Sequence, residues 1–237
     1  METTQLEVHL ADQERQLKFF SSFFWHRFRS DTVLRYLKKY EAIESVLDIG
    51  AGAGVFGLHI NEAYPNTKYS FVEPIPSLNE ALQTRYGAGA AVDPAGPFSQ
   101  RAFVMLDVLE HIENDFEFLK DLNAKMPHAS LLIITCPANK SLWSKWDEQM
   151  GHFRRYSRET LSDVCKRAGF EVLESKYIFH AFILPAYLRT KKEAVGPEFP
   201  QLSSSLNKLV YWFCRFESLI SKWIPFGTST VIVARKT

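Results

Sequence analysis

The sequence has few cysteines and no excess of charge of either sign. Its 237 residues include three cysteines, and no pair of them has the Cys-x-x-Cys spacing of a zinc knuckle or a redox site. The 28 basic and 27 acidic side chains give a formal net charge of +1, so no general electrostatic attraction to nucleic acid is expected. These counts argue against a disulfide framework and against a nucleic-acid partner.

Long apolar runs are also missing. The longest apolar stretch, residues 178–188, contains His180 and Pro185 and falls short of the about 20 residues that cross a bilayer. The first residues are polar and lack the basic-then-apolar pattern of a secretory signal. We therefore expect no transmembrane segment and a cytoplasmic protein.

Several common catalytic motifs are absent. The sequence contains no P-loop, no GxSxG and no HExxH, which argues against the common NTPases, hydrolases and zinc proteases. No tight cluster of histidines and carboxylates stands out at ligand spacing, so no metal is expected.

Short β-rich segments alternate with helical patterns from residue 45 onward, which predicts an α/β fold. This order is typical of a Rossmann-like, doubly wound, mostly parallel sheet of about seven strands with helices on both faces. Residues 87–97, rich in Gly, Ala and Pro, are either a loop or a degraded third strand. The predicted strands are 45–49, 68–72, 103–108, 130–135, 170–179 and 230–234, and the predicted helices lie near 5–40, 55–63, 75–86, 114–125, 160–168 and 203–224.

We expect a single domain over residues 1–237, divided into four parts. Extra N-terminal and C-terminal helices are expected to form a lid over the ligand, which binds at the carboxyl ends of the strands in such sheets. The parts are an N-terminal helical lid (1–44), a cofactor-binding core (45–180), a helical insertion (181–228) and a last strand (229–237).

The segment Val-Leu-Asp-Ile-Gly-Ala-Gly-Ala-Gly-Val-Phe-Gly, residues 46–57, is the most informative one. An apolar run passes Asp48 and breaks into alternating glycines, as where a buried strand ends and a helix begins. Glycine permits a tight turn and the close approach of a ligand, and the helix start offers free backbone N–H groups. The segment therefore predicts a site for a nucleoside-bearing cofactor.

Two cofactors fit this segment. Residues 52–57 match GxGxxG, and Glu73 follows about twenty residues later, as in dinucleotide-binding enzymes. The carboxylate of Asp48, however, would repel a diphosphate and suits a ligand that carries an ammonium and a sulfonium group. About 45 residues also precede the first strand, whereas dinucleotide domains often begin with theirs. S-adenosylmethionine is favoured, and a nicotinamide dinucleotide remains the alternative.

Later motifs strengthen this choice, because together they resemble the class I S-adenosylmethionine-dependent methyltransferases. The matching segments are 46–54, Tyr-Ser-Phe-Val-Glu-Pro (69–74), Val-Met-Leu-Asp-Val-Leu-Glu-His-Ile (104–112), and Arg-Tyr-Ser-Arg-Glu-Thr-Leu (155–161) with Ala-Gly-Phe (168–170). Residues 143–156 are similar to a bacterial-type subgroup of that family.

The resemblance implies methyl transfer from S-adenosylmethionine to a small-molecule oxygen, nitrogen or carbon atom, with S-adenosylhomocysteine as the product. Gln100 and Arg101 depart from the family, which usually has Phe-Asp before its fourth strand. Two alternatives therefore stay open: an NAD-dependent oxidoreductase, and a cofactor-binding protein without catalysis.

The resemblance also suggests the cofactor-binding residues. Asp48 would orient the amino end of the cofactor, and Glu73 would accept hydrogen bonds from both ribose hydroxyls. Asp93 would contact the adenine amine, and Asp107 would face the ligand from the end of its strand. The remaining contacts are expected from the backbone of Gly50, Ala51 and Gly52.

Catalytic and substrate-binding candidates follow the later strands. His111 is either a general base or a residue that shapes the helix start, and His152 and Tyr156 are further catalytic candidates. Arg154 and Arg155 either clamp a carboxylate or phosphate or form surface salt bridges. Trp143 and Trp146 line the pocket or cover the core. The acceptor is thus a small molecule, apolar or anionic, and the sequence indicates no oligomeric state.

Residues 206–223 have apolar side chains at helical spacing. Core packing is the first interpretation, a lid over an apolar substrate the second, and contact with a membrane surface a weaker third. The residues are Leu206, Leu209, Val210, Phe213, Phe216, Leu219, Ile220 and Trp223.

Overall fold

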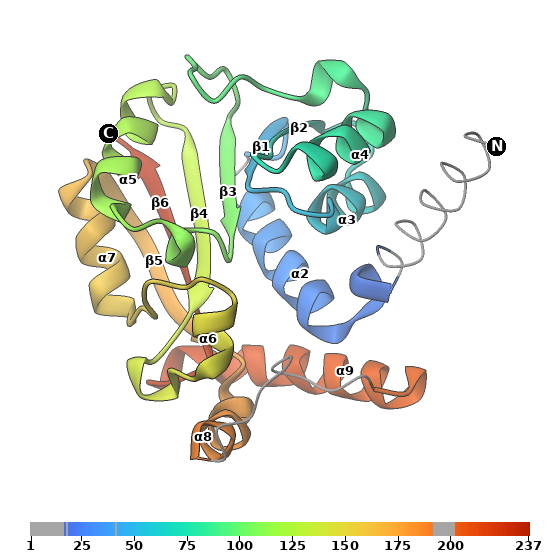
Figure 1. The fold of residues 1–237 in the computed structure, drawn as a ribbon, viewed down its shortest axis with the longest axis vertical. Coiled ribbons are helices and arrows are strands. Elements are labelled where there is room, and N and C mark those ends of the chain that lie inside the picture. The colour runs from blue at the N-terminus through green and yellow to red at the C-terminus, as the bar shows by residue number, and fades with distance from the viewer. Residues whose placement is uncertain (1–16, 18, 41, 192–201) are drawn as a thin grey trace.

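Six strands form one sheet in the order β2-β1-β3-β4-β6-β5 in the computed structural model, which describes residues 17, 19–40, 42–191 and 202–237 (Figure 1). The strands β1 to β4 run parallel, while β6 is antiparallel to both β4 and β5. Their bounds are β1 Ser45–Ile49, β2 Lys68–Val72, β3 Ala102–Leu106, β4 Leu131–Pro137, β5 Phe170–Ile178 and β6 Ser229–Lys236. The predicted α/β fold with a mostly parallel sheet is confirmed, with one strand fewer than the expected seven.

The missing strand corresponds to residues 87–97, and only a trace of it remains. Ala91 makes one isolated parallel bridge to Phe71, and the Val92 N–H donates to the Phe71 carbonyl at 2.9 Å. Around this bridge the chain forms a short 3-10 turn, Ala88–Ala90, and then an exposed loop. The run of Gly, Ala and Pro offers few β-branched or aromatic side chains to pack on a sheet, so pairing stops after one residue.

Helices cover both faces of the sheet, and successive strand residues point to opposite layers. Val46 packs with α2, α3 and α4, whereas Leu47 packs with α5 and α7. This alternation is the two-residue period of a strand whose two faces are both buried. The helix bounds are α2 Phe24–Lys39, α3 Val55–Ala63, α4 Pro76–Tyr86, α5 Asp115–Lys125, α6 Lys145–Gln149, α7 Arg158–Arg167, α8 Ile183–Lys191 and α9 Ser204–Ile220.

Helix α9 lies against α2 although the two are far apart in the sequence (Figure 1). The Asn207 side chain accepts a hydrogen bond from the Phe24 N–H at 2.8 Å and donates one to the Ser22 carbonyl at 2.7 Å. Phe23, at the N-cap position of α2, provides no side-chain hydrogen bond of its own. Asn207 therefore supplies a side-chain acceptor for an N–H group at this helix start.

Most of the apolar stripe on α9 is not core, which corrects the first interpretation of its sequence pattern, although Val210 packs partly buried against the core. Leu219 is 74% exposed and Trp223 is 76% exposed, while Cys214 and Glu217 are the buried side chains of α9. The stripe faces away from the sheet because α9 turns these two residues toward the rest of the protein instead. None of the described helices is both long enough and apolar enough to cross a bilayer.

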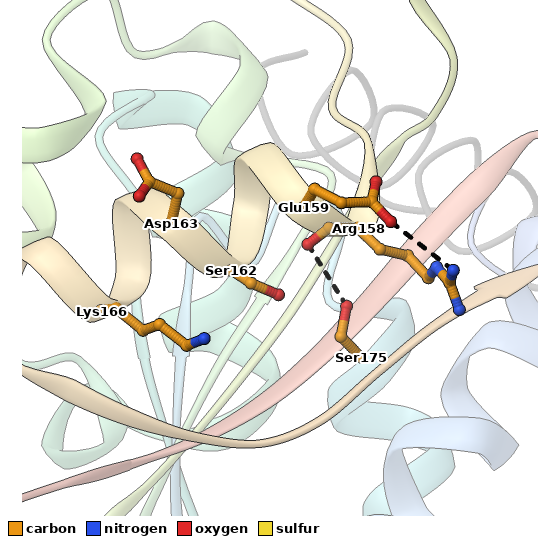
Figure 2. Close-up of a pocket in the computed structure, with 6 residues that line it drawn as sticks. All are labelled: Arg158, Glu159, Ser162, Asp163, Lys166 and Ser175. Carbon is orange, nitrogen blue, oxygen red and sulfur yellow. Dashed lines mark hydrogen bonds and ion pairs between the residues drawn. The ribbon is translucent and has the colours of Figure 1, made fainter.

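A surface pocket lies between α7 and β5, on the outer side of the sheet (Figure 2). Arg158 and Glu159 form an ion pair of 3.5 Å at its edge, and the Ser175 hydroxyl donates to the Arg158 carbonyl at 3.5 Å. The pocket contains none of the residues that the sequence predicts for the site, and its lining is a mixture of acidic, basic and hydroxyl side chains.

Candidate active site

The glycine bend between β1 and α3 has the backbone that the sequence predicts. Gly50 and Gly52 have φ angles of +72° and +56°, a region that L side chains rarely adopt. A Cβ on Gly50 would lie 2.7 Å from a Val108 methyl group, whereas a Cβ on Gly52 would meet nothing within 4 Å. Gly50 is therefore required by packing, and Gly52 borders open space where a ligand can approach the backbone.

Asp48 lies buried just before the bend. Its carboxyl accepts a hydrogen bond of 2.8 Å from the Tyr69 hydroxyl. Burial raises the pKa of Asp48 to about 7, although the Tyr69 hydrogen bond and the positive charge of Arg29 oppose this rise. A cationic group next to Asp48 would stabilise its ionised form, whereas a diphosphate would not. These features fit the amino end of S-adenosylmethionine.

Glu73, at the end of β2, is fixed beside the bend. One carboxylate oxygen accepts the Gly52 N–H at 2.7 Å and the other accepts the Ile75 N–H at 2.9 Å. A carboxylate oxygen has a second lone pair, so both oxygens can still accept from a ligand. Glu73 does not itself line the cavity described below, but it is hydrogen-bonded to Gly52, which lines that cavity.

Asp107 follows β3 with a φ of +58°, unusual for a residue other than glycine. Its carboxylate accepts a hydrogen bond of 3.0 Å from the Thr135 hydroxyl and forms an ion pair with Arg29 of α2. Asp107 therefore connects the carboxyl end of the sheet to the N-terminal helix. Asp93, in contrast, lies in the exposed loop, accepts the Ala95 N–H at 2.8 Å, and does not line the cavity.

A cavity of about 750 Å³ opens at this edge of the sheet. The glycine bend forms one side, and the N-terminal segment forms another with four aromatic side chains. None of the lining residues comes from α8 or α9, so within the described part of the chain only the N-terminal half of the expected lid covers the cavity. The lining includes Phe19, Phe20, Phe23, Trp25, His26, Arg29, Asp48, Gly50, Ala51, Gly52, Asp107, Glu110, His111, Trp146, His152 and Arg155.

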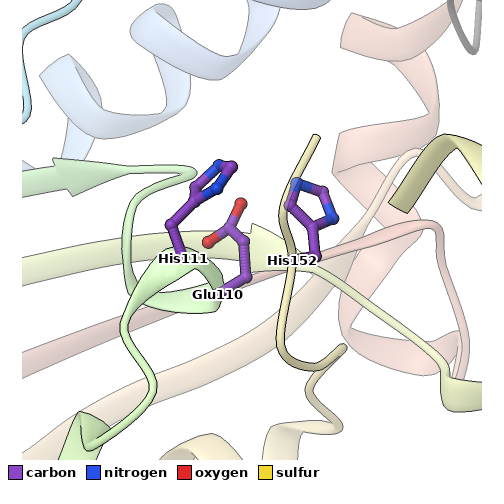
Figure 3. Close-up of side chains that lie close together, drawn as sticks. All are labelled: Glu110, His111 and His152. Atoms are coloured by element: carbon purple, nitrogen blue, oxygen red, sulfur yellow. The ribbon is translucent and has the colours of Figure 1, made fainter. Parts of the chain in front are cut away.

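Glu110, His111 and His152 form the polar end of the cavity (Figure 3). The two imidazole centroids are 4.6 Å apart, and a ligand-type atom from each of the three side chains lies within 4.8 Å of the others. Burial, and then His152, lower the pKa of His111, so its imidazole is neutral at neutral pH. Glu110 is fully buried, and burial, followed by the charge of Asp107, raises its pKa well above the usual range.

Asp147 fixes the orientation of the His152 ring through a hydrogen bond. Its carboxylate is fully buried and accepts bonds from the His152 Nδ1 at 2.9 Å and from the Arg155 Nε and Nη2 at 2.7 and 3.0 Å. Burial alone would raise the pKa of Asp147, but these hydrogen bonds outweigh it and lower the pKa to about 2. Arg155 lines the cavity, yet its guanidinium is already paired with this carboxylate.

Three of the predicted catalytic and substrate-binding residues lie outside the cavity lining. The Tyr156 hydroxyl donates to Asp115 at 2.6 Å, and burial, then this hydrogen bond, raises its pKa far above the usual range. Arg154 pairs with the same Asp115 carboxylate at 2.8 Å. The Trp143 indole donates to Glu148 at 3.4 Å, and Trp146 lines the cavity in its place. Neither a catalytic role for Tyr156 nor a substrate clamp from Arg154 is supported by these positions.

The structure adds three residues that the sequence did not single out: Arg29, Glu110 and Asp147. Arg29 lies on a helix 78 residues before its partner Asp107, so no local pattern connects them. Glu110 lies in the segment 104–112 between the two candidates Asp107 and His111, and this proximity was an available signal. Asp147 is the third helical residue of α6 and completes a capping box with Ser144, which was also readable.

Comparison with known proteins supports the same conclusion. A family model described as a methyltransferase domain matches residues 21–175, which is well over half of the chain. The chain therefore belongs to this family, and the resemblance to class I S-adenosylmethionine-dependent methyltransferases is confirmed. No curated protein matches the chain significantly.

Solved structures share the fold. A SAM-dependent methyltransferase from Archaeoglobus fulgidus is 20% identical, with a TM-score of 0.57 over 89% of this chain and 94% of that one. Phosphoethanolamine N-methyltransferase 2 from Haemonchus contortus, in complex with S-adenosyl-L-methionine, is 14% identical, with a TM-score of 0.57 over 87% and 52%. A coclaurine N-methyltransferase bound to N-methylheliamine and S-adenosylhomocysteine is 15% identical, with a TM-score of 0.54 over 87% and 72%.

The chain is thus an S-adenosylmethionine-dependent methyltransferase. This assignment favours methyl transfer over both alternatives, the NAD-dependent oxidoreductase and the cofactor-binding protein without catalysis.

Glu73→Ala is predicted to weaken the binding of S-adenosylhomocysteine by about 1–3 kcal/mol, because hydrogen bonds to a charged group are lost. Isothermal titration calorimetry measures this change. Glu80→Ala, an exposed acid on α4, is the matched control and should bind as the wild type does. An unchanged dissociation constant in a folded Glu73→Ala variant would remove Glu73 from the site.

The pKa of Asp48 predicts that affinity for S-adenosylhomocysteine rises with pH. Below pH 7 the carboxyl is mostly neutral, and above it the ionised form attracts the ligand's ammonium group. Affinity should therefore increase by up to about tenfold per unit up to pH 7 and then level off. Asp48→Asn should flatten this profile, and the exposed Asp121→Asn should leave it intact. A flat wild-type profile would contradict this role of Asp48.

Proposed function

We propose that this protein transfers the methyl group of S-adenosylmethionine to a small apolar acceptor bound in the cavity at the carboxyl ends of the strands. The observation that carries the proposal is that one cavity joins the glycine bend, an aromatic wall and the polar end. Its volume of about 750 Å³ falls within the range of small-molecule sites, about 300–1,000 Å³. S-adenosylmethionine, when bound, supplies a methyl group already activated by a sulfonium, so the protein mainly has to align the acceptor and exclude water.

The choice of an apolar over an anionic acceptor rests on the charges of the lining. Arg154 and Arg155, the two residues expected to clamp an anion, are paired with Asp115 and Asp147. The third arginine, Arg29, is paired with Asp107. An anionic acceptor would find these cations already neutralised, whereas an apolar acceptor finds four aromatic side chains.

The polar end of the cavity would face the acceptor's nucleophilic atom. The neutral imidazole of His111 can accept a proton or bind another group through its nitrogen lone pair. The orientation of His152 is fixed by its hydrogen bond to Asp147. The structurally similar proteins support the small-molecule class, since their names describe methyl transfer to phosphoethanolamine and to coclaurine. The division into four parts and the cytoplasmic location stay predictions.

A panel of phenols, aliphatic amines, carboxylates and phosphate esters tests the proposal through the release of S-adenosylhomocysteine. Turnover of aromatic or aliphatic members, with none for the anionic ones, is the expected result. Turnover confined to anionic or macromolecular acceptors would contradict the proposal.

Phe20→Ala is predicted to raise the KM of such an apolar acceptor by about tenfold or more, from a loss of about 1.5–3 kcal/mol of apolar burial. The affinity for S-adenosylhomocysteine should change little. Phe153→Ala is the matched control, because Phe153 is an exposed phenylalanine outside the cavity lining. Equal KM values for the two variants would show that the aromatic wall does not bind the acceptor.

A further inference from the structure

We propose that Glu110, His111 and His152 bind a divalent metal ion of the zinc type at the acceptor end of the cavity. The three side chains come from two segments that are distant in the sequence and meet at one point (Figure 3). No such cluster was visible in the sequence, because His152 lies 41 residues after His111 and only the fold brings them together.

The buried carboxylate of Glu110 is the first observation. Its side chain is 0% exposed, and neither oxygen makes a hydrogen bond of good geometry in the described structure, although the weakly donating Cys136 thiol lies beside it. A buried polar group without a partner is costly, and buried carboxylates are usually paired or coordinate a metal. Glu110 also belongs to the lining of the cavity.

The orientation of the two imidazoles is the second observation. The Nδ1 of His152 donates to Asp147, which leaves the Nε2 lone pair free. The backbone carbonyls of Met150 and Gly151 lie near the His111 ring. Metal-binding histidines almost always donate their other N–H to a carboxylate or carbonyl, as His152 does to Asp147. His152 therefore has the support that metal ligands require.

The donor set indicates the metal and its role. Two imidazoles and one carboxylate form the three-ligand set of catalytic zinc sites, which keep another position open for water or substrate. The open position would face the cavity, where an acceptor hydroxyl could bind and release its proton to water more readily. On the proposed function this favours an alcohol or phenol as the acceptor.

Titration of the metal-stripped, untagged full chain with Zn²⁺ tests the site without any methyl transfer. The wild type should bind one equivalent, and His111→Ala, His152→Ala and Glu110→Gln should each weaken binding by at least about tenfold. His128→Ala is the matched control, because His128 is exposed after α5. Circular dichroism checks folding, and the two histidine variants carry the test if Glu110→Gln does not fold.

Absence of Zn²⁺ binding, or equal affinity in the wild type and the folded variants, would overturn the metal site. The proposed function is judged separately by the acceptor panel. If the protein methylates an apolar acceptor but does not bind Zn²⁺, the proposed function stands and the metal site is refuted. If it binds Zn²⁺ but turns over no apolar acceptor, the metal site stands and the proposed function is refuted.

The exposed face of α8 and α9 carries a second, independent inference: we propose that it docks on an anionic lipid bilayer. Its large apolar side chains are between 42% and 76% exposed, an unusual concentration for a protein surface. Two of them are tryptophans, the side chain that prefers the membrane interface. They are Leu184, Tyr187, Leu188, Leu206, Leu209, Trp212, Phe213, Phe216, Leu219, Ile220 and, just after α9, Trp223.

The charges on these helices favour lipid over a second copy of the chain. The only acid of α8 and α9 is Glu217, which is buried and accepts the His180 and Ala181 N–H groups at 3.1 and 2.6 Å. Lys191 and Lys208 are exposed basic residues on these helices, whereas Arg215 is already paired with Asp31 at 3.6 Å. In a symmetric dimer the lysines would add like charges to one interface, whereas anionic headgroups would neutralise them.

Co-sedimentation with phosphatidylcholine vesicles, with and without phosphatidylglycerol, tests the docking face. The wild type should pellet, and more strongly with the anionic vesicles. A triple variant, Leu209→Ser with Phe216→Ser and Trp223→Ser, should partition at least about tenfold less, because three exposed apolar groups are lost. Phe153→Ser is the control for an exposed apolar side chain elsewhere.

A wild type that stays in the supernatant with both kinds of vesicle would overturn the membrane proposal. A dimer seen by light scattering and abolished by the triple variant would assign the face to a second copy instead.

Discussion

The hydrogen bond from the Gly52 N–H to the Glu73 carboxylate connects the glycine bend to the end of the neighbouring strand, and the site depends on it. This bond forms because β1 and β2 are parallel and adjacent, so both end at the same edge of the sheet. It fixes Glu73 beside the open space at Gly52. Asp48, buried in β1 four residues before Gly52, adds a carboxyl whose ionised form a cationic ligand would stabilise and a diphosphate would not. The cofactor preference is therefore a property of local strand geometry.

The N-terminal helix completes the site by a different interaction. Arg29 of α2 forms an ion pair with Asp107, which follows β3, and the Asn207 side chain of α9 accepts a hydrogen bond from the Phe24 N–H at the start of α2. The aromatic residues before and within α2 are thereby placed over the carboxyl ends of the strands, where they form the cavity wall. The same contact with α2 leaves the apolar stripe of α9 facing outward. The position of α2 thus explains both the aromatic wall of the cavity and the exposed apolar surface of α9.

The parts of the fold that local patterns determine were predictable from the sequence. The strands and the helix start at Val55 follow from apolar periodicity and from the glycine bend, so β1 and β2 match their predicted ranges. The third strand was ambiguous in the sequence, and the structure retains one bridge of it at Ala91. Periodicity could show that α9 is amphipathic, but not which side faces the core, because that depends on its contact with α2.

The residues of the candidate site also divide into those that local motifs predict and those that depend on tertiary contacts. Asp48, Gly52 and Glu73 belong to contiguous motifs and Asp107 follows a strand, and the structure places all four at the same edge of the sheet, where their roles stay predictions. The partners of Arg154 and Arg155 depend on how distant segments fold back, and of the two interpretations left open by the sequence the structure shows ion pairs with Asp115 and Asp147. Conversely, the grouping of Glu110 with His111 and His152 exists only in three dimensions.

The central claim is that this bend selects a cationic sulfur nucleoside over a pyrophosphate. Calorimetric titration of the full chain with S-adenosylhomocysteine and, separately, with NADH tests it most directly. The account predicts saturable binding of S-adenosylhomocysteine and no detectable heat of binding for NADH. Binding of NADH, with no response to S-adenosylhomocysteine, would contradict it.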